Sequence, residues 1–189
     1  MIGYLPDHDL GDWDAVTTVP ELTRVVTGLA RAALDAHGAT FVLREGDKCF
    51  YAAEDSASPL WAGQRFPASQ CISGWAMQHG RSAVVGDIET DPRIPVEAYR
   101  PTFVRSLVMC PVGRPEARAA IGAYWAYRHQ PAESTRAALE QIADATAIVL
   151  DRIGLAGAPW APTFSDRGGV GPGVVERGEF RVSSELGEP

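Results

Sequence analysis

Two segments of the chain carry apolar side chains at the three- and four-residue spacing of an amphipathic helix. The first begins at the N-cap residue Thr18, has Pro20 in its first turn and Glu21 as the partner of a capping box, and ends at His37-Gly38. Its apolar stripe consists of Leu22, Val25, Val26, Leu29, Ala30, Ala33 and Leu34. The second segment covers residues 133–153. We therefore predict a helix at each end of the folded region.

Short runs of β-forming residues lie between these two helices. We predict five strands, at residues 39–44, 48–53, 82–86, 105–112 and 119–127. The first two strands form a hairpin around a turn that contains Gly46, and the last two form a second hairpin around residues 113–116. Residues 54–69 are predicted to be irregular. A short helix over residues 70–79 is capped by Ser69 and closed by Gly80.

The segment at residues 87–102 contains three prolines and four acidic residues, which exclude a regular strand or a long helix. We expect a structured crossing segment with one helical turn at residues 96–99. Strands that run in antiparallel pairs, with helices left to pack on one face, predict an α+β fold with a single sheet that the terminal helices cover on one side.

The chain is predicted to hold one domain at residues 19–153, between a loosely packed leader at 1–18 and a tail at 154–189. Residues 155–189 contain seven glycines and four prolines, a composition typical of disorder. Two features of the tail favour some order, because Trp160 and Phe164 could dock on the body and residues 174–182 could pair as a small hairpin.

Composition and charge narrow the classes of function. A net charge of −7 provides no basic excess to neutralise phosphates, so nucleic-acid binding is not expected. A signal peptide and a membrane span are also not expected, and we predict a cytoplasmic protein that does not bind membranes. Three cysteines without CxxC spacing argue against a disulfide framework or a zinc cluster. The four histidines, His8, His37, His79 and His129, have no metal-ligand spacing, and His79 is explained as a cation at a helix C-terminus.

Five short motifs stand out in the folded region: Cys71-Ile72-Ser73-Gly74-Trp75-Ala76-Met77, Val84-Val85-Gly86-Asp87-Ile88, Asp91-Pro92-Arg93, Arg105-Ser106-Leu107-Val108-Met109-Cys110-Pro111 and Ile121-Gly122-Ala123-Tyr124-Trp125. Together they resemble GAF domains of the type attached to bacterial sensor histidine kinases. The resemblance covers residues 19–153. It implies a six-stranded antiparallel sheet with the terminal helices on one face and a ligand cavity on the other, under the short helix and the crossing segment.

The resemblance also implies which side chains lie near a ligand. These are Trp75, Asp87, Tyr99, Phe103, Arg105 and Trp125. A structural interpretation stays open beside it, in which Trp75 and Trp125 pack in the core, Asp87 caps a turn and Arg105 is paired on the surface.

Known activities of the family can be compared with these residues. Bilin-binding relatives have a cysteine followed by histidine where this chain has Ile94-Pro95, so covalent bilin attachment is not expected, and the Asn-Lys-Phe-Asp-Glu signature of cyclic-nucleotide binders is absent. Relatives that reduce free methionine sulfoxide have their nucleophilic cysteine near the position of Arg100. Their second cysteine falls at a position closer to Ser73 than to Cys71, so this chain departs from the pattern at both places. Cys49 and Cys110 are expected to be buried and inert, whereas Cys71 is a candidate reactive thiol near a helix N-terminus.

Three functions follow from this comparison. The first is a sensory module for an unidentified small molecule that acts in trans on a separate signalling partner. The second is a ligand-free dimerisation or protein-interaction module, and the third is a thiol redox enzyme of the methionine sulfoxide type. We favour the sensory module over an enzyme, and we expect a homodimer formed through the apolar stripes of residues 19–37 and 133–153.

Overall fold

Six strands form one sheet in the part of the chain that the computed structural model describes, residues 13–154. The strands are β1 (Gly38–Glu45), β2 (Lys48–Ser56), β3 (Arg65–Pro67), β4 (Ala83–Val85), β5 (Ser106–Val112) and β6 (Ala119–Trp125). Their order in the sheet is β3-β2-β1-β6-β5-β4, and every neighbouring pair is antiparallel. The expected α+β fold with a single antiparallel sheet is confirmed.

Helix α1 (Val19–Ala33) begins with the capping box expected from the sequence. The Glu21 backbone N–H donates to Thr18 Oγ1 at 3.4 Å, and the Thr18 backbone N–H donates to Glu21 Oε2 at 3.2 Å. The helix ends earlier than expected, with Leu34 as its C-cap. Asp35 follows with φ of 48°, and Gly38 is already the first residue of β1, so the intervening residues form the connection.

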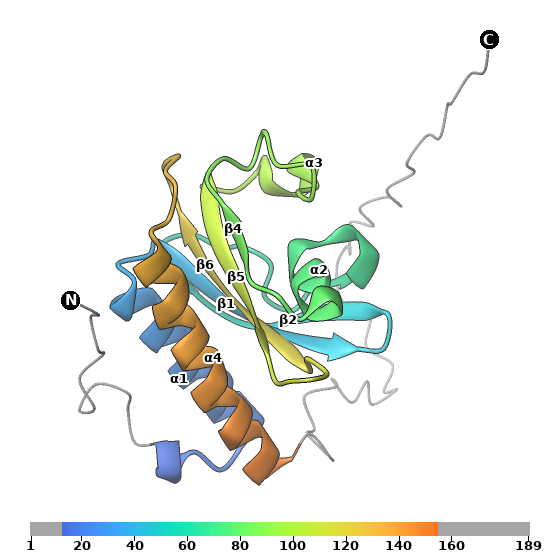
Figure 1. Cartoon of the computed structure of the whole chain (residues 1–189), viewed down its shortest axis with the longest axis vertical. Coiled ribbons are helices and arrows are strands. Elements are labelled where there is room, and N and C mark those ends of the chain that lie inside the picture. Colours follow the sequence, from blue (N-terminus) through green and yellow to red (C-terminus); the bar gives the residue numbers. More distant parts are fainter. Residues whose placement is uncertain (1–12, 155–189) are drawn as a thin grey trace, which may run out of the picture.

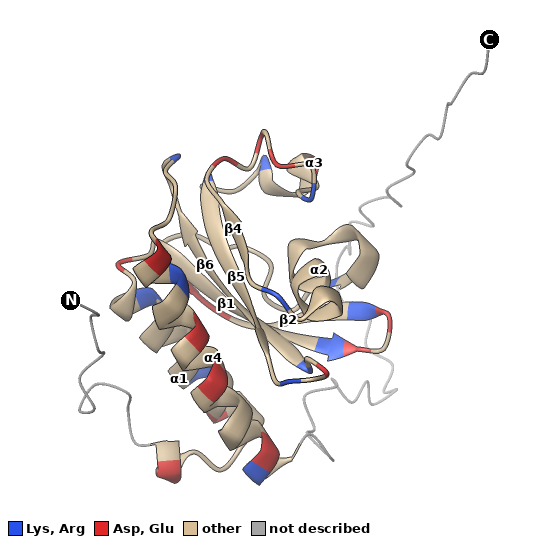
Figure 2. Ribbon diagram, in the orientation of Figure 1, with Lys and Arg blue, Asp and Glu red and all other residues tan. Residues whose placement is uncertain are grey.

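Helices α1 and α4 (Glu133–Ile153) lie side by side on one face of the sheet (Figure 1). Their apolar stripes are buried against the inward residues of the strands, including Leu22, Val26, Ile142 and Leu150. The buried part of each stripe is used within the chain, whereas Val25, Leu29 and Leu34 are only partly buried. The outer side of α4 carries charged residues (Figure 2) and Ile148, which is 72% exposed. Dimerisation itself stays a prediction.

The opposite face of the sheet carries α2 (Ile72–His79) and α3 (Val96–Tyr99). The helical turn expected at residues 96–99 is confirmed. The cap expected at Ser69 is wrong, because residues 68–70 form a separate 3-10 turn and Cys71 is the N-cap of α2. An added Cβ on Gly74 would lie 1.9 Å from the Ala68 carbonyl oxygen, so this turn packs directly against the helix backbone.

The expectation that residues 54–69 are irregular is wrong in two places. Strand β2 continues to Ser56, and β3 pairs with the start of β2 in the register Cys49 to Phe66. A three-residue strand has no room for an alternating pattern, and its formation depends on the free edge of β2 rather than on its own residues. The remaining strands lie within two residues of their expected ends.

Part of the expected leader is packed. Residues 13–15 form a 3-10 turn, Val16 is buried, and Arg152 of α4 donates to the Val16 carbonyl at 2.8 Å. Residues 1–12 and 155–189, which include Trp160, Phe164 and the possible hairpin, lie outside the described residues. Within residues 13–154, no helix is both long enough and apolar enough to cross a membrane.

Replacing Gly74 with alanine tests the contact between α2 and the preceding turn. The new methyl group would overlap the Ala68 backbone, which cannot yield as a side chain end could. We expect Gly74→Ala to lower the free energy of unfolding by about 3 kcal/mol, the upper part of the usual overpacking range. Urea denaturation measures the change.

Gly28→Ala is the matched control, because its added Cβ would meet no atom closer than 3.7 Å in the middle of α1. Removing a glycine from a helix interior should raise the free energy of unfolding by about 0.5–1 kcal/mol. Equal effects of the two substitutions would contradict the proposed packing of Gly74.

Candidate functional site

A cavity of about 630 Å³ lies on the sheet face opposite α1 and α4, between α2 and the segment that leads into α3. Five aromatic side chains line it: Tyr51, Trp61, Phe66, Trp75 and Tyr99. Polar groups enter from the short turn before α2 and from the segment at residues 92–99. An apolar cleft of this size with a few polar groups is typical of small-molecule sites.

The aromatic rings of the wall hold one another through edge-to-face contacts. The Trp61 ring lies 5.6 Å from that of Tyr51, 4.8 Å from that of Tyr99 and 5.7 Å from that of Tyr124, measured between centroids. Interplanar angles of 61–68° match the arrangement that aromatic quadrupoles favour. Trp61 therefore joins rings from β2, α3 and β6 into one wall.

The position of Trp61 is set by a carboxylate that the sequence analysis did not identify. Glu54 accepts hydrogen bonds from the backbone N–H groups of residues 60, 61 and 62 at 2.8–2.9 Å. The Trp61 indole N–H then donates to the Ala98 carbonyl at 3.4 Å. A negatively charged acceptor makes these bonds stronger than neutral ones, so Glu54 fixes the loop that carries the central ring.

Tyr124 packs under Trp61 because β6 provides space for its ring. An added Cβ on Gly122 would lie 2.4 Å from the Tyr124 hydroxyl, so the ring lies over the glycine. The hydroxyl is hydrogen-bonded to Thr40 Oγ1 at 2.8 Å, and both residues are fully buried. A side chain at position 122 would push Tyr124 towards the cavity.

The charged side chains of the cavity are held by neighbours. Arg93 forms an ion pair with Asp91 at 2.6 Å, and its guanidinium carbon lies 4.7 Å from the centroid of the Trp75 ring. This hydrogen-bonded pair lowers the pKa of Asp91 and keeps Arg93 charged. Glu97 pairs with Arg100 at 3.0 Å near the exposed edge. The wall thus offers a fixed cation that stacks on an aromatic ring.

Cys71 lines the same cavity at the start of α2. Its sulfur accepts a hydrogen bond from Ser73 Oγ at 3.2 Å, and Ser73 Oγ lies 3.2 Å from the Tyr51 hydroxyl. Hydrogen bonds from the Cys49 thiol, the Ser73 hydroxyl and the backbone N–H groups of Ser73 and Gly74 lower the pKa of Cys71 to about 6, against the opposing effect of burial. A thiol with this pKa is largely ionised at neutral pH.

The structure places two of the six expected ligand residues, Trp75 and Tyr99, on the cavity wall. Their contact with a ligand stays a prediction. Asp87 lies outside the cavity, where it accepts the backbone N–H of Glu89 at 2.9 Å and forms an ion pair with Arg128 at 3.1 Å. Asp87 therefore caps a turn, as the structural interpretation expected.

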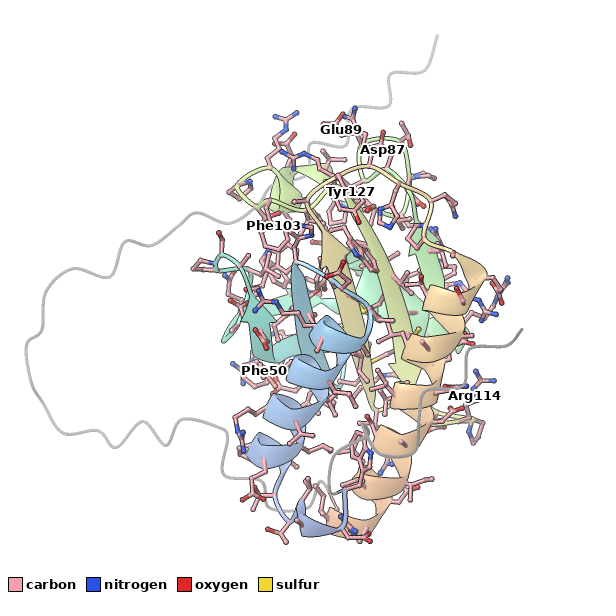
Figure 3. The ribbon with its side chains drawn as sticks, turned by 90° about the vertical axis from the view of Figure 1, so that its left-hand side faces the viewer. Phe50, Asp87, Glu89, Phe103, Arg114 and Tyr127 are labelled. Carbon is pink, nitrogen blue, oxygen red and sulfur yellow. The ribbon has the colours of Figure 1, made fainter. Side chains whose placement is uncertain are left out.

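The other three expected residues also lie outside the cavity wall. Phe103 packs near the ring of His37, at the same end of the molecule as Asp87 and Tyr127 (Figure 3). Arg105 donates to the carbonyl oxygens of Thr102 and Val104 instead of forming a surface ion pair.

Trp125 lies on the wrong face of the sheet for the expected role. It belongs to the core under α1 and α4, whereas Tyr124 belongs to the core on the cavity face. Successive residues of a strand point to opposite faces, so only one of these neighbouring aromatic residues can approach the cavity. Tyr124 therefore lies on the cavity side of β6, where it is fully buried beneath Trp61 and does not itself line the cavity.

His79 lies in the last turn of α2, as expected. Its ring stacks on that of Trp75 with centroids 4.6 Å apart, and Nδ1 lies 2.8 Å from the Trp75 carbonyl oxygen. Among residues 13–154, no group of three or more histidine, cysteine and acidic side chains is arranged to hold a metal ion.

The chain is similar in structure to several solved GAF domains and related proteins. It aligns with a free methionine-R-sulfoxide reductase from Neisseria meningitidis with a TM-score of 0.67 and 18% identity, over 77% of this chain and 85% of that one. For a GAF domain of a phosphoenolpyruvate-protein phosphotransferase from Coxiella burnetii the values are 0.67 and 14%, over 77% and 89% of the two chains. For residues 122 to 287 of a methyl-accepting chemotaxis protein they are 0.67 and 18%, over 79% and 99%.

These identities establish a common fold and nothing more specific. No curated protein sequence matches the chain. The family model described as GAF domain matches residues 16–151, which is well over half of the sequence. The match spans α1, the whole sheet, the cavity and nearly all of α4. The chain therefore belongs to the GAF domain family.

Proposed function

We propose that this protein is a regulatory domain that binds a small molecule in the aromatic cavity. The observation that carries the proposal is the cavity of about 630 Å³, with five aromatic side chains on its wall. Its volume lies within the range of about 300–1,000 Å³ that is common for ligand sites. An apolar wall that contains several aromatic side chains suits a planar or apolar ligand.

The polar groups of the wall indicate how such a ligand would be oriented. Arg93 is held in place by Asp91 and faces the cavity beside Trp75, so it offers a cation to a carboxylate or to a carbonyl oxygen. Gln70 and Glu97 add hydrogen-bonding groups nearer the entrance. A ligand with an aromatic body and one polar end fits this distribution.

Two other functions have less support. A purely structural domain does not require an apolar cavity of this volume, because burying apolar groups in a filled core is more favourable. The reductase mechanism implied by the resemblance requires a cysteine in the crossing segment, and residues 87–102 contain none. Signalling by ligand binding uses the cavity and requires no cysteine there.

Ligand binding would act by stabilising one packing of the cavity wall over another. The energy available for such a shift equals the difference between the ligand's free energies of binding to the two states. Trp61 contacts both α3 and β6, so its displacement would alter the sheet that α1 and α4 cover. The two long helices are the proposed output elements.

Filling the cavity tests the proposal. Val96 lies on the cavity wall and is half-buried, so Val96→Trp should occupy the space of a ligand. Native mass spectrometry of the protein purified from its own host should show a non-covalent adduct that is lost on denaturation. Val96→Trp should abolish the adduct. At a hundredfold excess over its dissociation constant, the recovered ligand should stabilise the wild-type protein by about 2.7 kcal/mol.

Ile148→Trp is the control, since Ile148 is 72% exposed on α4 and lies outside the cavity lining. This variant should keep the adduct. A wild-type protein without an adduct, and without thermal stabilisation by any compound of a metabolite library, would contradict ligand sensing and favour an interaction module.

A further inference from the structure

Two cysteines from different elements meet below the cavity. Cys49 lies on β2 and Cys71 lies at the start of α2, and both belong to the apolar cluster on the cavity face. Hydrogen bonding between the two thiols shifts the pKa of each of them. The third cysteine, Cys110, belongs to the core on the opposite face of the sheet. The fold therefore forms a pair of thiols and keeps the third thiol apart from it.

The two thiols differ in their access to the cavity. Cys71 lines the cavity and is 8% exposed, whereas Cys49 is 0% exposed and does not line it. A reagent that enters the cavity reaches Cys71 first. Cys49 can then react with the modified sulfur of Cys71, although the reagent itself does not reach Cys49.

A buried hydrogen-bond chain holds the Cys71 sulfur. Ser73 is fully buried and uses its hydroxyl hydrogen on Cys71, so the Tyr51 hydroxyl donates to Ser73 Oγ. These contacts stabilise the thiolate of Cys71 at the start of α2. The hydrogen bond to Cys71, together with burial, raises the pKa of Cys49, so Cys49 keeps its proton and serves as the hydrogen-bond donor.

We propose that the cavity is also a thiol oxidation site, in which a small hydroperoxide oxidises Cys71 and Cys49 then closes a Cys49–Cys71 disulfide. The Cys71 thiolate attacks one oxygen of the hydroperoxide, an S–O bond forms, the O–O bond breaks, and an alcohol or water leaves after taking a proton from solvent. The Cys49 thiol attacks the Cys71 sulfur, an S–S bond forms, and the oxygen leaves as water. The thiols lose two electrons and the hydroperoxide accepts them.

The disulfide would change the cavity as well as the thiols. It would join β2 to the start of α2 and convert the Cys71 thiolate that accepts the Ser73 hydroxyl into an uncharged disulfide sulfur, which is a weaker acceptor. A cellular dithiol would restore both thiols by exchange. The oxidation site goes beyond the proposed ligand sensing and does not depend on it.

The pH dependence of alkylation tests the reactive form of Cys71. The titratable groups around it come from several elements and are Cys49 and Tyr51 of β2, Tyr99 of α3, Tyr124 of β6, and Arg93 and Glu97 of the cavity wall. Burial raises the pKa values of the three tyrosines, so they stay neutral below pH 9 or so.

Because the pKa of Cys71 is lowered to about 6, its thiolate forms at lower pH than that of an ordinary cysteine. Alkylation by iodoacetamide should rise through about pH 6 and level off above about pH 7, whereas a free cysteine of pKa about 8.5 continues to gain reactivity. Peptide mapping should place the label on Cys71. A rate that keeps rising through pH 8.5 or so, as for that free cysteine, would contradict a stabilised thiolate.

Oxidation of the full chain with hydrogen peroxide tests the disulfide. The number of free thiols should fall from three to one, and a non-reducing peptide map should join Cys49 to Cys71. Reduction with dithiothreitol should restore all three thiols. In Cys49→Ala the reaction should stop at the sulfenic acid, which dimedone labels at Cys71, and in Cys71→Ala the loss of thiols should be at least tenfold slower.

Cys110→Ala is the matched control, because it removes a buried cysteine from the other core and should leave the disulfide unchanged. If Cys49→Ala or Cys71→Ala does not fold, the non-reducing peptide map of the oxidised wild-type protein still shows whether Cys49 is joined to Cys71. A map in which Cys71 is oxidised without being joined to Cys49, or in which Cys110 reacts as fast as Cys71, overturns the proposal.

Discussion

The fold depends on a sheet whose central strands are buried on both faces. Every residue of β5 and β6 is buried, so each strand supplies alternate side chains to two separate cores. One core is closed by α1 and α4, and the other lies under the cavity. Small residues in β6, including Ala119, Ala120 and Gly122, leave space for the large rings of Tyr124 and Trp125 on opposite faces. Because both faces of these strands are buried, β5 and β6 contain almost no polar residues.

The two cores are closed by different means. Two long helices cover the first with continuous apolar stripes, whereas short segments cover the second and are held by polar contacts. Glu54 gathers three backbone N–H groups around Trp61, Asp91 holds Arg93, and Gly74 lets the turn before α2 approach the helix backbone. Short segments fixed at separate points do not fill the space between them. The space left between the short segments is the cavity, and it therefore lies on the face of the sheet that the long helices do not cover.

Local signals in the sequence were sufficient for α4, for the start of α1 and for the short turn in the crossing segment. The capping box at Thr18 and the boundaries of α4 depend on residues close together in the chain, and the pattern of those residues predicts them. Strand β3 and the contacts of Glu54 depend on partners that only the folded sheet provides. The resemblance assigned Trp125 to the cavity, and a strand buried on both faces has no polar alternation that would show which side Trp125 occupies. The pairing of Cys49 with Cys71 likewise depends on how β2 meets α2, which no spacing in the sequence indicates.

A series of direct contacts connects the cavity with the helical face. The Trp61 ring contacts that of Tyr124 at 5.7 Å, and Tyr124 is followed in β6 by Trp125, whose indole N–H donates to the Asp35 carbonyl beyond the end of α1 at 3.2 Å. Because β6 is buried on both faces, it cannot move its cavity side without also moving the residues beneath α1 and α4. A ligand that displaces Trp61 would therefore act on β6, and a disulfide that draws α2 towards β2 would act on the same face of the sheet. The size of either effect is limited by the free energy with which the ligand or the disulfide favours one arrangement of the sheet over the other.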